Sequence, residues 1–323
     1  MVLPAAGCGG GEAEDAETTT PSTTDPSNGT PTTDEGTSPT VTPRRGDGPE
    51  PSGRIAFYSF RDGNEEVYVM NPDGSEQVNL TNDPAADYEP DWSPDGEQIA
   101  FVSDREGGPH IYVMNADGTN VHPLTQGSGG YFSPRWSPDG RRIALSRNGT
   151  LMVMDADGSS LRTVMAPEPE ETAALCRAGG FVGGWSPDNQ HITYYSASVT
   201  RGIFQVCVIG VDGSEPEVIV SEPPGLHAEP VWSSDGRSLA YRSVRAENHD
   251  VYVIDLETRE ERRLTDDPYL DGEPEWSPDD QWIVFKSYRE FPNSDIYIMR
   301  RDGSDVRRLT TDPDSDVYPV WAP

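Results

Sequence analysis

The sequence predicts an all-β chain folded as a six-bladed β-propeller, and three observations lead to this fold class. Tryptophan recurs along the chain, with gaps of 44, 49, 47, 44 and 45 residues between successive members of the series. A repeat of about 40 to 50 residues is typical of propeller blades. Short alternating stretches are separated by Asp-Gly pairs, the pattern of antiparallel hairpins, and no segment reads as a long helix. The series consists of Trp92, Trp136, Trp185, Trp232, Trp276 and Trp321.

Each repeat contains four short segments that predict strands, and residues 90–125 show them in order. The stretch "PDWSPDG" (90–96) gives a first strand and an Asp-Gly turn, and "QIAFVS" (98–103) gives a second strand. The alternating "HIYVMNADG" (110–118) gives a third strand with another turn, and "NVHPLT" (120–125) gives a fourth. Four such strands make one antiparallel blade.

The two ends of the repeat region predict how the circle closes. The first repeat begins at "GRIAFYSF" (53–60), already at a second strand, whereas the sequence ends in "VYPVWAP" (317–323), a first strand. These fragments complete one blade if residues 318–321 pair with residues 54–80. Closure of this kind removes the exposed edges of an open array.

The repeated motif carries a family resemblance. "WSPDG" stands at 92 and 136, "WSPDN" at 185, "WSSDG" at 232 and "WSPDD" at 276, followed by strands such as "IAF" and tails such as "YVMNADG". This pattern resembles the PD40, or WD40-like, repeats of TolB-type six-bladed propellers over residues 53–323. The resemblance implies the fold, whereas related propellers serve as binding modules, as gating domains of peptidases and occasionally as polysaccharide lyases. It also implies that the channel mouth can accept a segment of a partner.

The first 52 residues predict a lipid-anchored, extracytoplasmic protein, either periplasmic or at the cell surface. Cys8 lies in "LPAAGCGGG", which looks like the end of a lipoprotein signal (1–8), although the basic start and full apolar stretch are missing. A start codon placed too late and a chance cluster of small residues both explain the incomplete signal. Residues 9–52 are rich in Thr, Pro and acidic residues and predict a disordered tether to the propeller at 53–323.

The charge of the chain limits its partners. A formal net charge of −32 opposes binding to nucleic acid or anionic lipid. No run of apolar residues reaches the about 18 to 20 needed to span a bilayer. We therefore expect a monomer whose partner is a protein, a peptide or a glycan, with membrane contact only through the lipid anchor.

The positions five residues before each tryptophan predict a functional mouth. Several of them are acidic and one is histidine, and no arginine matches them in the repeat pattern. Oxygen ligands of this kind suit Ca²⁺, and the acids could also hold a cationic group of a partner or stand solvated in loops. The predicted binding residues are Asp87, His227, Asp271 and Asp316, with possible calcium at Asp87, Asp271 and Asp316.

A second pattern predicts ion pairs that brace the blades. Glutamate three positions before the tryptophan and arginine thirteen positions after it occur together in three repeats and are both absent in two. Guanidinium and carboxylate groups form strong paired hydrogen bonds. The predicted pairs are Glu89–Arg105, Glu229–Arg245 and Glu273–Arg289.

The third and fourth repeats depart from the consensus and predict a partner-facing rim. A short "SRNGT" turn is followed by the longest insertion, residues 166–184. Loops on a rigid scaffold often carry recognition, although insertion drift also explains the departure. The predicted rim residues are Tyr131, Phe132, Arg177 and Phe181. Cys176 in the insertion and Cys207 on a nearby strand could form a disulfide in an oxidising compartment.

The sequence favours a non-catalytic binding or scaffold module over an enzyme. It has no G-x-S-x-G nucleophile motif, and its five histidines are scattered over different repeat positions. The alternatives are a cation-dependent polysaccharide lyase or hydrolase acting at the channel mouth, and a purely structural spacer.

Overall fold

The computed structural model describes residues 49–168, 176–198, 202–221, 226–245 and 248–323. The chain separates into two units, Met1–Arg44 and Arg45–Pro323, and the account below concerns the second. Cys8, the predicted signal remnant 1–8 and the tether up to residue 48 lie outside the described residues, so their predicted roles stay predictions.

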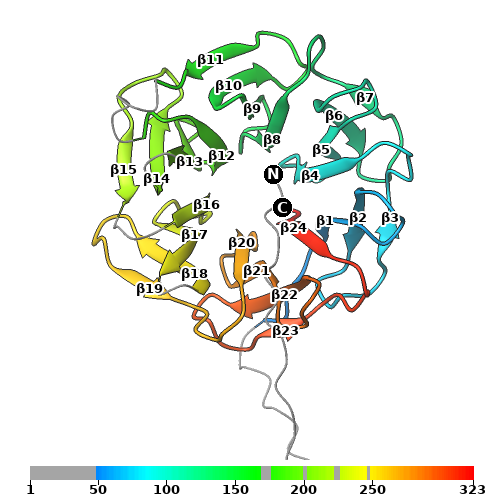
Figure 1. Cartoon of the computed structure of the whole chain (residues 1–323), viewed down its shortest axis with the longest axis vertical. Helices are drawn as coiled ribbons and strands as arrows, with labels where there is room; N and C mark the ends of the chain where they lie inside the picture. Colours follow the sequence, from blue (N-terminus) through cyan, green and yellow to red (C-terminus); the bar gives the residue numbers. More distant parts are fainter. Residues whose placement is uncertain (1–48, 169–175, 199–201, 222–225, 246–247) are drawn as a thin grey trace, which may run out of the picture. The chain divides into compact units, whose positions relative to one another are not determined.

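The described part of the chain contains 24 β-strands and no helix, in agreement with the all-β prediction. Figure 1 shows them as sheets arranged around a central opening, with one strand of each set next to the opening and another at the outside. The innermost strands are β4 (Asp87–Trp92), β8 (Tyr131–Trp136), β12 (Gly180–Trp185), β16 (Leu226–Trp232), β20 (Asp271–Trp276) and β24 (Asp316–Trp321).

Three further strands follow outward in each set. The second strands are β1 (Ile55–Ser59), β5 (Gln98–Ser103), β9 (Arg142–Arg147), β13 (His191–Ser198), β17 (Ser238–Arg245) and β21 (Trp282–Ser287). The third strands are β2 (Glu66–Met70), β6 (His110–Asn115), β10 (Thr150–Asp155), β14 (Ile203–Gly210), β18 (Asn248–Asp255) and β22 (Asp295–Arg300). The outer strands are β3 (Val78–Asn79), β7 (His122–Pro123), β11 (Arg162–Met165), β15 (Glu217–Val220), β19 (Glu261–Arg263) and β23 (Arg307–Arg308).

Within each set the strands pair in chain order, and two further pairings link strands that are not consecutive. The last strand, β24, pairs antiparallel with β1, with Trp321 opposite Ile55 and Asp316 opposite Ser59. This gives a sheet in the order β24-β1-β2-β3, built from both ends of the repeat region. A single parallel bridge, Phe204 to Leu226, joins the sets that begin with β12 and β16 into one eight-stranded sheet.

The apolar core lies between neighbouring sheets. Adjacent residues of one strand point to opposite faces of the sheet. Phe101 of β5 therefore packs in a cluster with Val69 of β2, whereas Val102 packs in another with Ile143 of β9. All four side chains are fully buried. Strands buried on both faces explain why "QIAFVS" and "HIYVMN" are apolar almost throughout.

The "WSPDG" motif builds the turn that joins the first two strands of a repeat. In the β4–β5 turn, the Ser93 hydroxyl donates to Asp95 at 2.6 Å and accepts from the Gln98 backbone N–H at 2.9 Å. Gly96 has a φ of 70°, a conformation that favours glycine. The hydrogen bond from Ser93 lowers the pKa of Asp95. The aspartates of these turns are thus committed to local structure.

A bulge in the innermost strands turns one side chain of most repeats toward the central channel. The register of β4 against β5 shifts between Tyr88 and Asp91, and the residue three positions before the tryptophan has positive φ in five repeats. Bulges of this kind redirect side chains and are common next to functional sites. The five residues are Glu89, Ser133, Glu229, Glu273 and Tyr318, with φ between 51° and 55°.

The channel has two different ends. We call the end at which the innermost strands begin the mouth, and the end at which they finish, at the six tryptophans, the funnel. Residues 49–54 lie at the funnel end: the indole N–H of Trp321 donates to the Ser52 carbonyl at 2.7 Å, and that of Trp282 donates to the Pro49 carbonyl at 3.3 Å. Among the described residues no helix is long and apolar enough to cross a membrane.

Candidate functional site

The mouth of the channel has a charged wall built by two adjacent repeats. Glu229 and Glu273 project from the bulges of β16 and β20, and Arg242 and Lys286 stand ten residues after the tryptophan, on β17 and β21. The guanidinium Nε of Arg242 lies 3.1 Å from both carboxylate oxygens of Glu229, and the ammonium of Lys286 donates to Glu273. Two carboxylates are thus each paired with a cation.

The same carboxylates link neighbouring repeats around the channel. Glu229 accepts the backbone N–H of Glu273 at 2.7 Å, and Glu273 accepts the backbone N–H of Tyr318 at 2.7 Å. Burial alone would lower the pKa values of Arg242 and Lys286, but the neighbouring glutamates outweigh burial and raise both. The two cations therefore stay charged at neutral pH.

A cavity of about 250 Å³ opens beside this wall. His249 of β18 lines it and lies 3.0 Å from Arg242, from Nδ1 to Nη1. Because a guanidinium only donates hydrogen bonds, Nδ1 of His249 must accept, and the ring proton sits on Nε2. Burial and the charge of Arg242 lower the pKa of His249, which keeps the imidazole neutral. The remaining lining residues are Glu229, Leu270, Asp271, Gly272, Lys286 and Tyr288.

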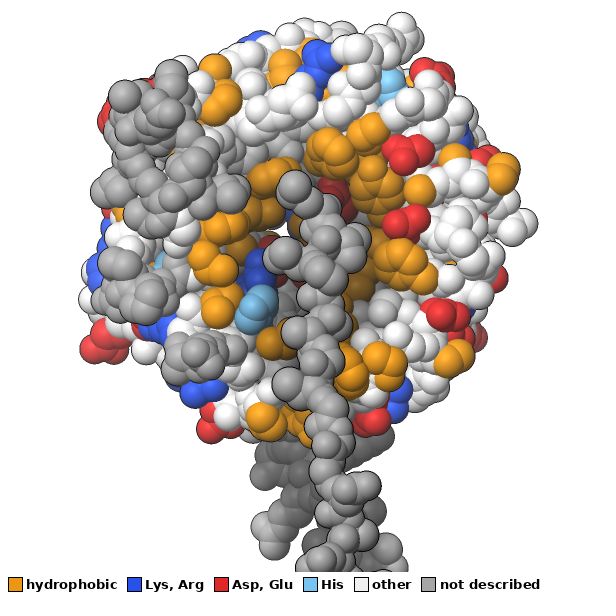
Figure 2. Space-filling model, in the orientation of Figure 1, with side chains coloured by type: hydrophobic (Ala, Val, Ile, Leu, Met, Phe, Trp, Pro, Cys, Tyr) orange, Lys and Arg blue, Asp and Glu red, His pale blue; other side chains and the backbone are white. Residues whose placement is uncertain are grey.

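Aromatic side chains of the neighbouring repeats form a second part of the mouth, the aromatic wall. The ring centroid of Tyr58 lies 5.8 Å from that of Phe60, 6.1 Å from that of Tyr88 and 6.2 Å from that of Tyr318. Phe181 stacks on Tyr195 at 5.2 Å and is 37% exposed. Figure 2 shows a face on which hydrophobic side chains surround a central opening, with basic and histidine side chains inside it. The mouth therefore offers an aromatic surface beside a charged one.

The funnel contains a second charged group, centred on Arg135 of β8. Its Nε donates to the Gly183 carbonyl at 2.8 Å, and its Nη1 lies 3.3 Å from Asp91. Burial raises the pKa of Asp91 to about 6 against the opposing effect of Arg135, and burial raises that of Glu275 to about 7 in the same way. The funnel encloses about 360 Å³ between the six tryptophans.

Comparison with known proteins identifies the repeats. A sequence profile of the TolB beta propeller domain (PD40) matches residues 48–182 and 144–323. The chain belongs to this family. A search of curated proteins found no match to the sequence of this TolB-type propeller.

Solved structures share the fold of this propeller. TolB from Acinetobacter baumannii is 22% identical, with a TM-score of 0.71 over 84% of this chain and 67% of its own. A chain of a nidogen/laminin complex is 10% identical, with a TM-score of 0.66 over 83% of this chain and 98% of its own. An oligogalacturonate lyase in complex with manganese is 16% identical, with a TM-score of 0.53 over 82% and 75%. At these identities the likeness concerns the fold alone.

The acidic residues predicted at the mouth of the propeller are buried beneath it. The predicted absence of matching arginines is wrong: Asp316 bonds Arg61 at 2.8 and 2.9 Å, Asp87 bonds Arg105 at 2.6 Å, and Asp271 bonds Arg289 at 3.1 Å. All three carboxylates are at most 1% exposed. Burial raises the pKa values of Asp87 and Asp271 to about 6, although the hydrogen bonds and the arginines lower them.

These arginines correct the predicted ion pairs. Arg105 and Arg289 use the aspartates five positions before the tryptophan, and Arg245 pairs with Glu261 at 2.7 Å. The predicted pairs Glu89–Arg105, Glu229–Arg245 and Glu273–Arg289 are therefore wrong. The bulge is the physical reason, because it turns each glutamate toward the channel; Glu89, for example, accepts the Ser133 N–H at 2.6 Å.

The predicted calcium site does not form. Asp87, Asp271 and Asp316 are each held by an arginine of their own repeat. Among the described residues no group of three or more His, Cys, Asp or Glu side chains could hold a metal ion. His227 is buried as well, with Nδ1 2.9 Å from the Ser243 hydroxyl.

The predicted rim divides into buried and accessible residues. Tyr131 is only 4% exposed, because the Arg147 guanidinium lies 4.6 Å above its ring, so its placement on an open rim is wrong. Phe132 is half-buried and Phe181 is exposed at the aromatic wall. Arg177 forms an ion pair with Glu215 at 2.7 Å. Residues 169–175 of the insertion lie outside the described residues.

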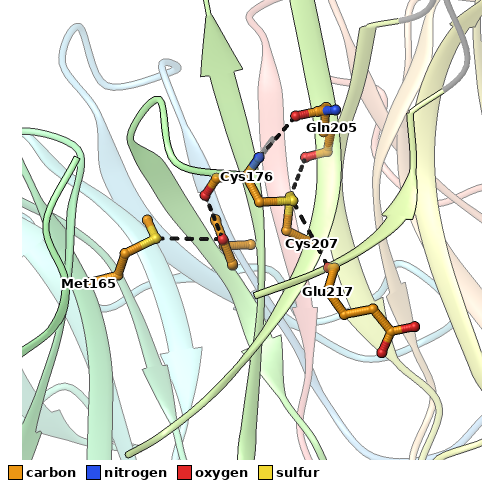
Figure 3. Close-up of a disulfide and its surroundings, with 6 residues drawn as sticks. Met165, Cys176, Gln205, Cys207 and Glu217 are labelled. Atoms are coloured by element: carbon orange, nitrogen blue, oxygen red, sulfur yellow. Dashed lines mark hydrogen bonds between the residues drawn. A yellow bond between two sulfur atoms is a disulfide. The ribbon is translucent and has the colours of Figure 1, made fainter. Parts of the chain in front are cut away.

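A disulfide joins the insertion to its repeat. The sulfur atoms of Cys176 and Cys207 are 1.97 Å apart, and both side chains are buried (Figure 3). The Cys176 N–H donates to Gln205 at 3.1 Å, and its carbonyl accepts the Tyr194 hydroxyl at 2.7 Å. The chain is thus fixed four residues before β12 begins.

The charged wall was missed by the sequence analysis, although a signal exists. The position ten residues after the tryptophan carries Val102, Ser146 and Tyr195 in three repeats but Arg242 and Lys286 in two consecutive ones. Lys286 is also the only lysine of the sequence. Aligning this position across the repeats would have drawn attention to both residues.

The buried carboxylates predict how stability depends on pH. Asp87, Asp91 and Asp271 have pKa values of about 6 and Glu275 of about 7, above their ordinary values, so between about pH 4 and 7 the folded state binds protons that the unfolded state releases. The free energy of unfolding should therefore rise by several kcal/mol as pH falls from 8 to 5. Urea denaturation at pH 8, 6.5 and 5 measures this, and a flat or falling stability would contradict it.

Proposed function

We propose that the chain is a non-catalytic binding module, a six-bladed propeller closed by the pairing of β24 with β1, whose mouth holds a segment of a partner protein. One observation carries this proposal: the mouth presents an aromatic wall beside a charged wall in which Glu229 and Glu273 each already have two protein partners. Aromatic side chains and cations paired in this way are typical of recognition surfaces, because they offer apolar contact and hydrogen bonds together.

The proposal includes an extracytoplasmic location with lipid attachment at Cys8 and a tether over residues 9–52, whose last four residues, 49–52, lie against the funnel end of the propeller. The Cys176–Cys207 disulfide supports the location, since disulfides persist in oxidising compartments. The chain of similar fold in the nidogen/laminin complex belongs to a complex between proteins, which favours a partner that is a protein.

The alternative of a cation-dependent polysaccharide lyase or hydrolase has less support. The observation that favours this alternative is the fold shared with oligogalacturonate lyases at 16% and 14% identity. The predicted metal ligands of this chain are instead bonded to Arg61, Arg105 and Arg289. A glycan held without turnover stays open as a second ligand class for the same mouth.

Selection of peptides from a phage-displayed library on the full-length protein tests the proposal. We expect enriched peptides that lose about tenfold or more in affinity for Phe181→Ala, because this side chain lies on the aromatic wall. Leu161→Ala is the matched control, since Leu161 has the same 37% exposure and precedes the outer strand β11.

Two results would overturn the proposed function. The first is a set of peptides whose affinity for the Phe181→Ala variant equals their affinity for the native protein, because such peptides would contact another surface. The second is consumption of oligogalacturonate by the full-length protein, which would show an enzyme.

A further inference from the structure

We infer that Arg242, Lys286 and His249 form a carboxylate-binding subsite, and that the ligand places an aromatic side chain beside that carboxylate. The inference rests on the proposed function and names the chemistry that the mouth recognises. The subsite is the cavity of about 250 Å³ on the charged wall.

The hydrogen bonds around the cavity leave donors rather than acceptors for a ligand. Arg242 uses Nε on Glu229 and Nη1 on His249, and within the described part of the chain no hydrogen bond engages its Nη2. The ammonium of Lys286 carries three N–H groups and donates one of them to Glu273. Glu229 and Glu273 each hold a cation and a backbone N–H of the next repeat.

His249 adds a further donor of fixed position. Its Nδ1 accepts from Arg242, so the proton on Nε2 is available to a ligand. Two permanent cations and a neutral N–H donor suit a carboxylate, which accepts several charge-assisted hydrogen bonds at once.

Gly272 fixes the position of the arginine in this cavity. A Cβ atom on Gly272 would lie 2.6 Å from Cδ of Arg242 and 3.3 Å from Oε2 of Glu229. Any side chain here would displace the guanidinium or its carboxylate partner. The backbone of β20 thus leaves the space that the Arg242–Glu229 pair occupies.

Apolar side chains in the same cavity account for the aromatic part of the ligand. Leu270 is 40% exposed, Tyr288 lines the cavity beside it, and the Tyr288 N–H donates to the Leu270 carbonyl at 3.1 Å. Tyr195 and Tyr318 line a narrower part of the channel together with Glu229 and Glu273. A ring bound against these side chains places an attached carboxylate toward Arg242 and Lys286.

Two matched small molecules test the subsite on the full-length protein. N-acetyl-L-tryptophan carries the ring and the carboxylate, whereas N-acetyl-L-tryptophanamide carries the same ring with a neutral amide. By isothermal titration calorimetry we expect the acid to bind about tenfold or more tightly than the amide. Added salt should weaken binding of the acid more than that of the amide, because screening acts on charge.

Three variants locate this preference. Gly272→Ala and the charge-balanced double variant Lys286→Met with Glu273→Gln should each reduce the acid-to-amide ratio to about threefold or less. Arg147→Gln, on a different repeat and outside the cavity, should leave the ratio unchanged. Circular dichroism checks that each variant is folded, and the salt series on the native protein tests the inference without any variant.

The outcomes separate this inference from the proposed function. Equal binding of acid and amide, both weakened by Phe181→Ala, would overturn the carboxylate subsite while the peptide-binding mouth stands. Binding of digalacturonate through Lys286 and Arg242 without binding of N-acetyl-L-tryptophan would overturn the peptide assignment in favour of a glycan. A preference for the acid that persists in both cavity variants would overturn the assignment of these residues.

Discussion

Replacing Arg135 with methionine is expected to destabilise the protein by about 3 to 5 kcal/mol at pH 8. Arg135 is 9% exposed and is the cation beside Asp91 and Glu275 in the funnel. Its loss leaves two carboxylates in a narrow channel without their counter-charge, and it removes the hydrogen bond to the Gly183 carbonyl. Urea denaturation monitored by tryptophan fluorescence measures the change.

The same variant should recover part of its stability in acid. At pH 5 the carboxyls of Asp91 and Glu275, with pKa values of about 6 and 7, are largely protonated and no longer need a cation. The control is Arg147→Met, because Arg147 covers the Tyr131 ring at the mouth and should cost about 1 kcal/mol or less. An equal cost for Arg135→Met at pH 8 and pH 5 would contradict the electrostatic explanation.

Removing the disulfide with Cys176→Ala and Cys207→Ala is expected to cost about 3 to 4 kcal/mol. The two residues are 31 positions apart, and a cross-link over such a loop restricts the unfolded chain. Thermal and urea unfolding of the full-length protein with and without dithiothreitol measure the same difference without mutation.

Cys8→Ala is the control for this experiment, because it removes the one cysteine that is not part of the bridge. It should leave both unfolding midpoints unchanged, and reductant should act only on proteins with the Cys176–Cys207 pair. An unchanged midpoint in the double variant would show that the Tyr194 hydrogen bond to Cys176 and the packing of β12 hold the segment without the bridge.

The fold could be predicted because the strands and turns of each repeat are determined by residues within that repeat. Residues 92–103 contain a turn followed by a strand that is buried on both faces. The hydrogen bonds of the turn are made within it, for example from the Ser93 hydroxyl to Asp95. These interactions span only a few residues, so their sequence pattern repeats visibly. The pairing of β24 with β1 follows from the incomplete repeats at the two ends of the propeller region.

The charged residues of the site were placed less well, because their directions depend on the bulge. The joint occurrence of glutamate and arginine in three repeats suggests that Glu89 pairs with Arg105. The positive φ of Glu89 instead turns its side chain toward the next repeat, and Arg105 forms its ion pair with Asp87. A register shift of one residue exchanges which side chains face the channel, and periodicity alone does not reveal it.

The sequence by itself determined the all-β class, the repeat and the family of this protein, since these depend on local patterns repeated along the chain. Only the tertiary structure decided which charges meet, because Glu229, Arg242, Lys286 and His249 come from four strands and converge on one cavity. It also showed that the acids predicted to bind calcium are buried with arginines. The physical reason is that a charged side chain pairs with whichever opposite charge lies nearest in space, and in this protein that neighbour is set by bulges and by the adjoining repeat.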